Sequence, residues 1–271
     1  MSNIILGYGS IIANAGTLTG GTYEDKLPLS NSRTDILAAV ARTTTDAEIT
    51  VTIPFTADQT VGCIAICNHN FSADAQVQFV VKDNGVTPTF IPTIIASSTI
   101  KPRIDTTRNS ILTFWLESNV TTCRSIEITI TDIGNTDTYL EFGHIFVGKQ
   151  FETSVNAEYG ALSHGVTDMS ANSFTKNGVK FSDIRQKLRT STLTLAWLTE
   201  TESLEVNNLR QLCGITSPIV YGLSRPTYDA LVPDEKSSVF TFIGAMSELD
   251  ALSATNFERY STQFQIKELG I

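Results

Sequence analysis

The sequence lacks both a long hydrophobic run and a run of basic residues. No stretch of its 271 residues approaches the ~20 apolar residues that a transmembrane helix needs, so we expect no membrane insertion. The N-terminal stretch MSNIILGYGSIIANAG has no cationic segment, which argues against a secretory signal peptide. The 19 Lys and Arg residues are scattered along a chain of net charge −9, whereas nucleic-acid-binding proteins carry a basic patch. We therefore expect no nucleic-acid recognition.

Cysteine and histidine are scarce, with four and three residues. Cys63, Cys67 and His69 lie close together in VGCIAICNHNF, which raises the question of a metal site. A structural zinc site takes four ligands, usually as two close pairs, and a second pair is missing because Cys123 and Cys213 are solitary. Alternate residues of a strand share a face, and both faces of this stretch are apolar. We predict a buried central strand with free thiols, no metal and no other cofactor.

Catalytic motifs are missing as well. Gly7-Tyr8-Gly9-Ser10 follows the apolar run NIIL, as in a dinucleotide-binding turn, but no helical pattern follows it, which favours a strand that ends in a glycine turn. Neither a G-x-S-x-G elbow nor a P-loop lysine motif is present. A glycoside hydrolase needs two carboxylates on one sheet face, whereas the expected strands present Ile, Val and Thr. We predict no catalytic residue and no enzymatic activity.

Three groups of acidic residues lie in turn-like stretches. Asp132, Asn135 and Asp137 have the close spacing of oxygen ligands that suits calcium, but no repeating loop pattern supports such a site. A solvated turn is the favoured interpretation there. The pairs Glu24-Asp25 and Asp234-Glu235 are likewise expected to be solvated.

The apolar sequence that is present suffices for two cores. Hydrophobic residues make up 41% of the chain and charged residues 17%, which excludes a disordered chain, and its length fits two domains of average size. In the first half, alternating apolar stretches are separated by Asn, Asp, Gly, Pro and Thr. The expected strands are NIILG, 47–55, 61–67, 76–81, 110–117, 125–133 and 138–149, with a tight turn at 83–85. This pattern predicts an antiparallel jelly-roll β-sandwich over residues 1–150.

The second half, residues 151–271, begins with a polar segment. Residues 150–182 are rich in Ser, Asn and Gly and contain an Asn177-Gly178 turn. They are interpreted as a crossing between the domains, with short strands that form either a long arm or a passive linker.

A β-domain with one helix is expected after this segment. Thr199-Glu-Thr-Glu202 has the spacing of a capping box, which starts a helix near 201–213, and Gly214 is a plausible C-cap. Leu204, Leu209 and Leu212 are expected on one helical face. The expected strands are 187–198, 217–224, 237–247 and 259–269, the last with Tyr260, Thr262, Phe264 and Ile266 on one face.

Three stretches of the first half resemble tail proteins of long-tailed, siphovirus-like bacteriophages. They are LPLSNSRTDILAAVART, VGCIAICNHNFSADAQVQFVV and YLEFGHIFVGKQFE, in this order. Those proteins carry an N-terminal jelly roll similar to discoidin and galactose-binding domains. The second half, with its strand–helix–strand order and final ELG, is similar to the tail-tube-like fold of distal tail and tail-tip proteins. The resemblance implies a carbohydrate-binding-like sandwich followed by a tail-tube-like β-domain with one packed helix.

The resemblance also implies a function and partners. The chain is then a non-catalytic subunit of a distal tail or tail-tip ring, a six-fold homo-oligomer that contacts the tube, hub and tape-measure proteins. It is assembled in the host cytoplasm and resides in the virion. The alternative is a tail adhesin that binds a glycan on the host surface.

Glycan contact needs exposed aromatic and polar side chains on loops. Trp115 and Trp197 lie on expected strands and are expected in the core. No residue is assigned as a ligand contact. The few candidates on expected loops are Tyr23, Phe71 and Phe90, with His69, Asn70 and Arg103 nearby in sequence.

Overall fold

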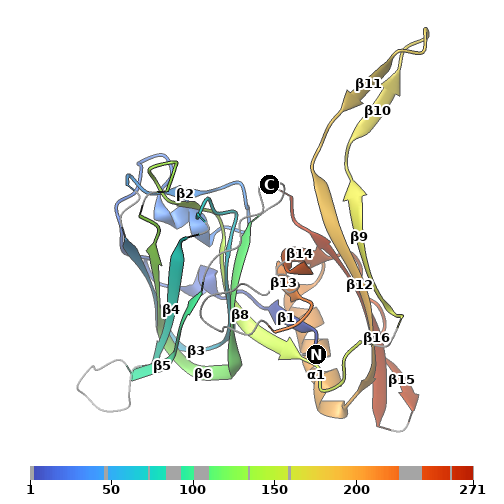
Figure 1. Ribbon diagram of the computed structural model, residues 1–271. Coiled ribbons are helices and arrows are strands. Elements are labelled where there is room, and N and C mark those ends of the chain that lie inside the picture. Colours follow the sequence, from blue (N-terminus) through green and yellow to red (C-terminus); the bar gives the residue numbers. More distant parts are fainter. Residues whose placement is uncertain are drawn as a thin grey trace.

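The computed structural model describes residues 3–45, 48–72, 74–83, 93–100, 110–133, 135–157, 160–225, 240–256 and 258–270. Within these residues the chain is mainly β with one α-helix, and most strands belong to one 12-stranded antiparallel sheet (Figure 1). The expected fold class, a β-sandwich followed by a β-domain with one packed helix, is confirmed.

The elements follow one another along the chain in a simple order. They are β1 (Ile5–Tyr8), the 3-10 helices η1 (Ile12–Asn14) and η2 (Leu29–Arg33), β2 (Ala41–Arg42), β3 (Ile49–Cys67), β4 (Gln76–Asp83), β5 (Thr93–Ile100), β6 (Ile111–Thr131), β7 (Glu141–Phe142), β8 (Ile145–Glu152), β9 (Leu162–Asp168), β10 (Ala171–Phe174), β11 (Lys180–Asp183), β12 (Lys187–Leu198), α1 (Glu200–Cys213), β13 (Ile219–Gly222), β14 (Phe242–Met246), β15 (Ser253–Asn256) and β16 (Arg259–Glu268).

The first half is an antiparallel β-sandwich. In β4, Val77, Phe79 and Val81 are fully buried whereas Gln76 and Gln78 are exposed, which is the two-residue alternation of a strand with one face on a core. β4 pairs with β5 and β6, β6 pairs with β3, and β3 pairs with β8. β5 was not expected from the sequence, and residues 84 and 85 of the expected turn lie outside the described residues.

β3 and β6 are longer than the sequence predicts. The expected strands 47–55 and 61–67 form one continuous strand, and so do 110–117 and 125–133. The β3–β6 register shifts between Pro54 and Cys63, where residues 56–58 are exposed. Irregularities of this kind bend a strand pair. The polar segment between two apolar stretches is therefore a bend within a strand rather than a loop.

Helix α1 packs on the sheet of the second half. Its start is as expected: Thr199 Oγ1 accepts from the Glu202 backbone N–H, Glu202 Oε2 accepts from the Thr199 N–H, and Gly214 is the C-cap with φ of 52°. The expected leucine face is wrong, because only Leu209 is buried while Leu204 and Leu212 are exposed. The buried stripe of the helix is Ser203, Val206, Leu209 and Cys213.

The expected alternation of the last strand is confirmed. Thr262, Phe264 and Ile266 of β16 are buried, and Tyr260 is half-buried on the same side. The expected strand 217–224 is β13, and the described part of 237–247 forms β14.

The N-terminal strand β1 joins the two halves. It lies between β8 and β13 and pairs with both, so the sheet runs without a break from the sandwich into the second half (Figure 1). Gly9 follows β1 with φ of 64°, which agrees with a strand that ends in a glycine turn. The expected domain boundary near residue 150, and the likeness of the second half to tail tubes, stay predictions.

A mixed apolar cluster lies where the halves meet. It contains Ile5, Leu37, Cys63, Ala65, Cys67, Trp115, Phe146, Val220 and Ile243. Cys63 and Cys67 are free and fully buried in it, so the expected central strand with both faces covered is confirmed. No helix among the described residues is long and apolar enough to cross a membrane.

Candidate interaction site

A two-stranded ribbon leaves the body of the second half. β9 pairs with the first part of β12, from Leu162 opposite Leu193 to Asp168 opposite Lys187, and β10 pairs with β11 beyond them (Figure 1). The ribbon ends in a turn around Gly178, which has φ of 77°. We call residues 162–187 the arm. Of the two alternatives that the sequence leaves open for this segment, the structure has the arm.

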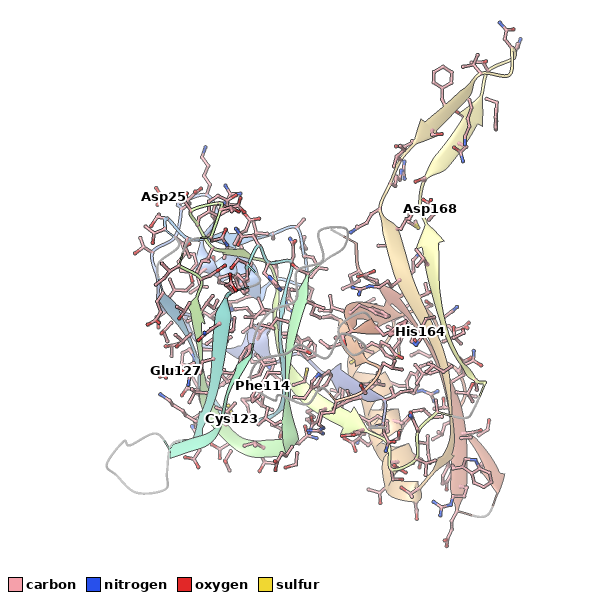
Figure 2. All side chains as sticks on the ribbon, in the orientation of Figure 1. Asp25, Phe114, Cys123, Glu127, His164 and Asp168 are labelled. Atoms are coloured by element: carbon pink, nitrogen blue, oxygen red, sulfur yellow. The ribbon has the colours of Figure 1, made fainter. Side chains whose placement is uncertain are left out.

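The arm exposes large apolar side chains. Phe174 is 68% exposed, Phe181 58% and Ile184 86%. In Figure 2 the side chains of its outer part project on both sides of the ribbon, away from the rest of the molecule. A lone two-stranded ribbon is marginally stable in water, and exposed apolar patches mark interaction surfaces. The full set is Val166, Met169, Phe174, Val179, Phe181 and Ile184.

The two aromatic side chains of the arm lie on opposite faces. Phe181 pairs with Ser173, and Phe174 pairs with Lys180, so the two phenylalanines differ by one position in the alternation of the ribbon. Either face therefore offers one aromatic ring to a partner.

The arm is basic, whereas the chain as a whole is acidic. It contains Lys176, Lys180, Arg185 and Lys187 against Asp168 and Asp183, a net charge of +2, while the whole chain carries −9. The residues outside the arm therefore carry −11. This segregation gives the arm and the body opposite charge.

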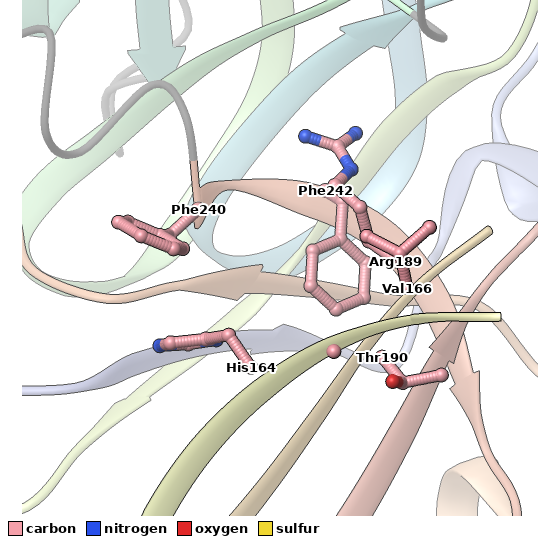
Figure 3. Close-up of a pocket in the computed structure, with 7 residues that line it drawn as sticks. His164, Val166, Arg189, Thr190, Phe240 and Phe242 are labelled. Atoms are coloured by element: carbon pink, nitrogen blue, oxygen red, sulfur yellow. The ribbon is translucent and has the colours of Figure 1, made fainter. Parts of the chain in front are cut away.

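A cavity of about 260 Å³ lies at the base of the arm (Figure 3). The rings of His164 and Phe240 face each other with centroids 4.5 Å apart, and Phe242 lies on the other side beside Arg189. Partial burial lowers the pKa of His164 from its ordinary value. Aromatic rings thus stand on two sides of the cavity. The lining residues are His164, Gly165, Val166, Arg189, Thr190, Phe240 and Phe242.

A buried ion pair supports this cavity. Glu268 Oε1 accepts from Arg189 Nε at 2.9 Å and also from Nη2, and Glu268 Oε2 accepts from the Arg189 backbone N–H at 2.8 Å. Arg189 Nη1 donates to the Thr241 carbonyl at 3.0 Å, and its guanidinium lies 5.3 Å from the centre of the Phe242 ring. These contacts tie β12 to β16 and to the residue before β14, and they fix one cavity wall.

Three of the candidate glycan residues of the sandwich loops pack or bond within the sandwich. Phe71 is 1% exposed and packs in the sandwich core, which corrects its expected place on an exposed loop. His69 is buried and stacks on Phe71 with ring centroids 4.4 Å apart. Asn70 accepts from the Glu141 N–H and donates to Asp137 and to the Tyr139 carbonyl, so its amide ties loops together.

The remaining candidates divide into one partly exposed residue and two outside the described residues. Tyr23 is half-buried, its ring meets Phe142 edge to face, and burial raises its pKa. Phe90 and Arg103 lie outside the described residues.

The interpretation of the Asp132 stretch as a solvated turn is wrong for two of its three residues. Asp132 and Asn135 are buried, and only Asp137 is exposed. Asp132 accepts from the Ser72 N–H at 2.7 Å and from the Asn135 side chain at 2.8 Å, which clamps two loops. Among the described residues no group of three His, Cys, Asp or Glu has the arrangement of a metal site. Glu24 and Asp25 are exposed, as expected, and 234–235 lie outside the described residues.

The two tryptophans differ in their exposure to solvent. Trp115 is 2% exposed in the cluster between the halves, as expected. Trp197 is 51% exposed, which corrects its expected place in the core. It has φ of 73° within a register shift of β12 between Leu195 and Leu198. That irregularity breaks the alternation on which the prediction depends.

The sequence interpretation missed the cavity and the aromatic residues of the arm. One sequence feature marks the hairpin: the stretch FTKNGVKF places Phe174 and Phe181 symmetrically about Asn177-Gly178. His164 and Phe240 are 76 positions apart, so no spacing rule brings them together.

Comparisons with known proteins find similarity only among solved structures. No protein-family model matches the chain, and no curated protein matches it. A family 32 carbohydrate-binding module from C. perfringens NanJ, in complex with galactose, is 15% identical and covers 54% of this chain and 99% of its own, with a TM-score of 0.40. A fucose-binding module from Streptococcus pneumoniae is 13% identical and covers 51% and 94%, with a TM-score of 0.39. Reduced XRCC1 bound to the DNA polymerase beta catalytic domain is 10% identical and covers 50% and 97%, with a TM-score of 0.39.

Proposed function

We propose that this chain is a non-catalytic structural subunit of a bacteriophage tail, in the distal tail or tail-tip ring. The observation that carries the proposal is the arm, which holds exposed apolar side chains away from the body. A head-to-tail contact in which the arm of one copy binds the body of the next uses two different surfaces. Such contacts close into a ring when the rotation allows it. The proposed location is the virion, and the six-fold symmetry follows from the resemblance to phage tail proteins.

Two further features support assembly over a passive role. The arm extends away from the body of the second half (Figure 1), and its positive charge opposes the negative charge of the remaining chain. Complementary charge speeds the encounter between subunits and disfavours contacts between the basic outer parts of two arms. The tube, hub and tape-measure proteins are the further partners that the resemblance implies.

Shortening the arm is expected to abolish self-assembly without destabilising the body. The variant replaces residues 170–185 by Asn-Gly, which joins Met169 to Gln186, a pair already in backbone contact. Sedimentation velocity from micromolar to millimolar concentration is expected to show ring-sized oligomers for the wild type and monomers for the variant. Thermal midpoints are expected to agree, because the removed residues are exposed apart from the half-buried Ser170.

A full-length control separates side-chain contacts from arm length. It replaces Phe174, Phe181 and Ile184 by serine and is also expected to remain monomeric. A wild-type chain that is monomeric throughout this range, or a shortened variant that assembles normally, would contradict the proposal. The proposal would also be contradicted if images of the phage tail to which this chain is assigned show that the chain is absent from the particle.

Glycan binding is the second candidate function. The specific observation in its favour is Trp197, an exposed aromatic side chain held at positive φ; strained positions cluster at functional sites. A glycan array with the wild type and a Trp197→Ala variant tests it. Binding that disappears in the variant would favour this candidate, whereas an array without signal leaves the structural role as the better account.

A further inference from the structure

We propose that the cavity at the base of the arm is the receiving site for an aromatic side chain from the arm of a second copy of this chain. The inserted ring belongs to Phe174 or Phe181, and only one of them enters because they lie on opposite faces of the ribbon. The inference rests on the proposed function, since it requires that the arm mediates assembly. It adds the place on the neighbouring subunit where the arm binds.

The size and walls of the cavity fit one aromatic ring. At about 260 Å³ it is larger than the ~150 Å³ cavity that accommodates benzene in a protein core, and smaller than the ~300–1,000 Å³ of ordinary small-molecule sites. His164 and Phe240 on one side and Phe242 on the other present ring faces and edges to an inserted ring. Aromatic pairs add roughly 0.5–1.5 kcal/mol beyond the area that they bury.

The length of the arm excludes insertion into its own cavity. Eight positions separate Val166 in the cavity wall from Phe174 near the tip, which amounts to about 26 Å in an extended strand. A compact unit the size of the second half, residues 151–271, has a radius of gyration of about 14 Å. The reach of the arm is therefore about twice this radius, which is long enough to carry its tip beyond the half from which it starts and toward an adjacent copy.

Charge favours a second copy as the occupant. The arm carries +2 and the remaining residues −11, so the arm of one copy is attracted to the body of another. An anchor side chain in a pocket is also where the binding energy of an interface concentrates, with aromatic residues enriched among such anchors.

Blocking the cavity is the central test. Val166→Trp places a ring in the cavity from an exposed position, and Thr167→Trp adds the same ring to the opposite face of β9 as a matched control. Val166→Trp is expected to weaken self-association at least about tenfold, and Thr167→Trp to leave it near the wild-type value. Phe174→Ala and Phe181→Ala are tested separately. One of the two variants is expected to lose self-association to a similar extent, because only one of the two rings enters the cavity.

Cross-linking locates the contact. A Val166→Cys variant is mixed with either Ser173→Cys, on the face of Phe181, or Asn172→Cys, on the face of Phe174, and treated with a short bismaleimide. The four native cysteines are buried and burial raises their thiol pKa values, so they do not compete for the reagent. Cross-linked dimers are expected for one of the two mixtures and for none of the single variants.

The outcomes separate this inference from the proposed function. If the shortened arm blocks assembly but Val166→Trp and both Phe→Ala variants assemble like the wild type, the arm binds elsewhere and the inference fails while the proposed function stands. Equal weakening by Val166→Trp and Thr167→Trp would also overturn it, since the effect would then belong to the strand and not to the cavity. Normal assembly of the shortened variant would contradict both this inference and the proposed function.

Discussion

Replacement of Arg189 by methionine is expected to destabilise the chain by about 3–5 kcal/mol. The reason is the carboxylate that the substitution leaves behind. The Glu268 side chain is only 3% exposed, and its Oε1 accepts hydrogen bonds from two guanidinium nitrogens of Arg189. Without these two bonds, the only hydrogen bond that residue 189 still donates to Glu268 comes from its backbone N–H. A buried charge without its partner costs several kcal/mol of stability.

A double variant tests this explanation. Replacing a buried ion pair by two apolar residues of similar volume is often neutral, because the pair's attraction only offsets the cost of removing both charges from water. Arg189→Met combined with Glu268→Leu is therefore expected to recover most of the loss. Denaturant unfolding of the wild type, both single variants and the double variant gives the coupling free energy. A single Arg189→Met variant within about 1 kcal/mol of the wild type would contradict the prediction.

The same pair connects stability with assembly. Arg189 lines the cavity at the base of the arm, and its guanidinium lies against Phe242. A double variant that recovers stability but not self-association would show that the position of this wall matters apart from the fold. The ion pair is thus a positioning feature for the cavity.

Local rules of the sequence sufficed for the helix. Thr199, Glu202 and Gly214 act within one or two turns of α1, so the capping box and C-cap needed no knowledge of the rest of the chain. The prediction of the buried face of α1 was wrong for a geometric reason. At 100° per residue, the buried residues Cys213, Val206 and Ser203 all lie to one side of Leu209 around the helix. Leu212 and Leu204 lie about 60° and about 140° away on the other side, so they point to solvent.

Features that depend on tertiary packing were not available from the sequence. The bends of β3 and β6 look like loops because their exposed residues are polar, although the strands continue through them. Phe71 looks like a loop residue because it follows Asn68-His69-Asn70, yet it fills the sandwich core. The cavity joins residues of β9, β12 and β14, which only the sheet order brings together.

The chain is also expected to lose stability between pH 6.5 and 4.5, and the buried His69 contributes to this loss. Burial lowers the pKa of His69 from 6.5 to about 3, and the nearby Asp132 carboxylate offsets only part of that shift. The Phe71 N–H donates to His69 Nδ1 at 3.3 Å, and Nε2 has no hydrogen-bond partner among the described residues. A second proton would therefore place a charge on a buried ring whose Nε2 has no acceptor among the described residues.

The sign of the effect follows from proton uptake. Above pH 6.5 the imidazole is neutral in both folded and unfolded chains, so it contributes no pH dependence. Below 6.5 the unfolded chain binds the proton first, and each further pH unit costs about 1.4 kcal/mol of stability until the folded pKa is reached. By pH 4.5 the loss from His69 is on the order of 2–3 kcal/mol. Burial also lowers the pKa of His144, which adds a loss of the same sign.

A His69→Gln variant isolates the contribution of this side chain. Glutamine does not titrate, and all other ionisable groups are shared with the wild type, so the difference between the two stability profiles reports on His69 alone. Urea unfolding at half-unit steps from pH 7.5 to 4.5 is expected to show profiles that converge as the pH falls, because the wild type loses more stability than the variant. Profiles that stay parallel through this range would show that His69 titrates normally in the folded chain. The conclusion that its imidazole is buried and stays neutral would then be wrong.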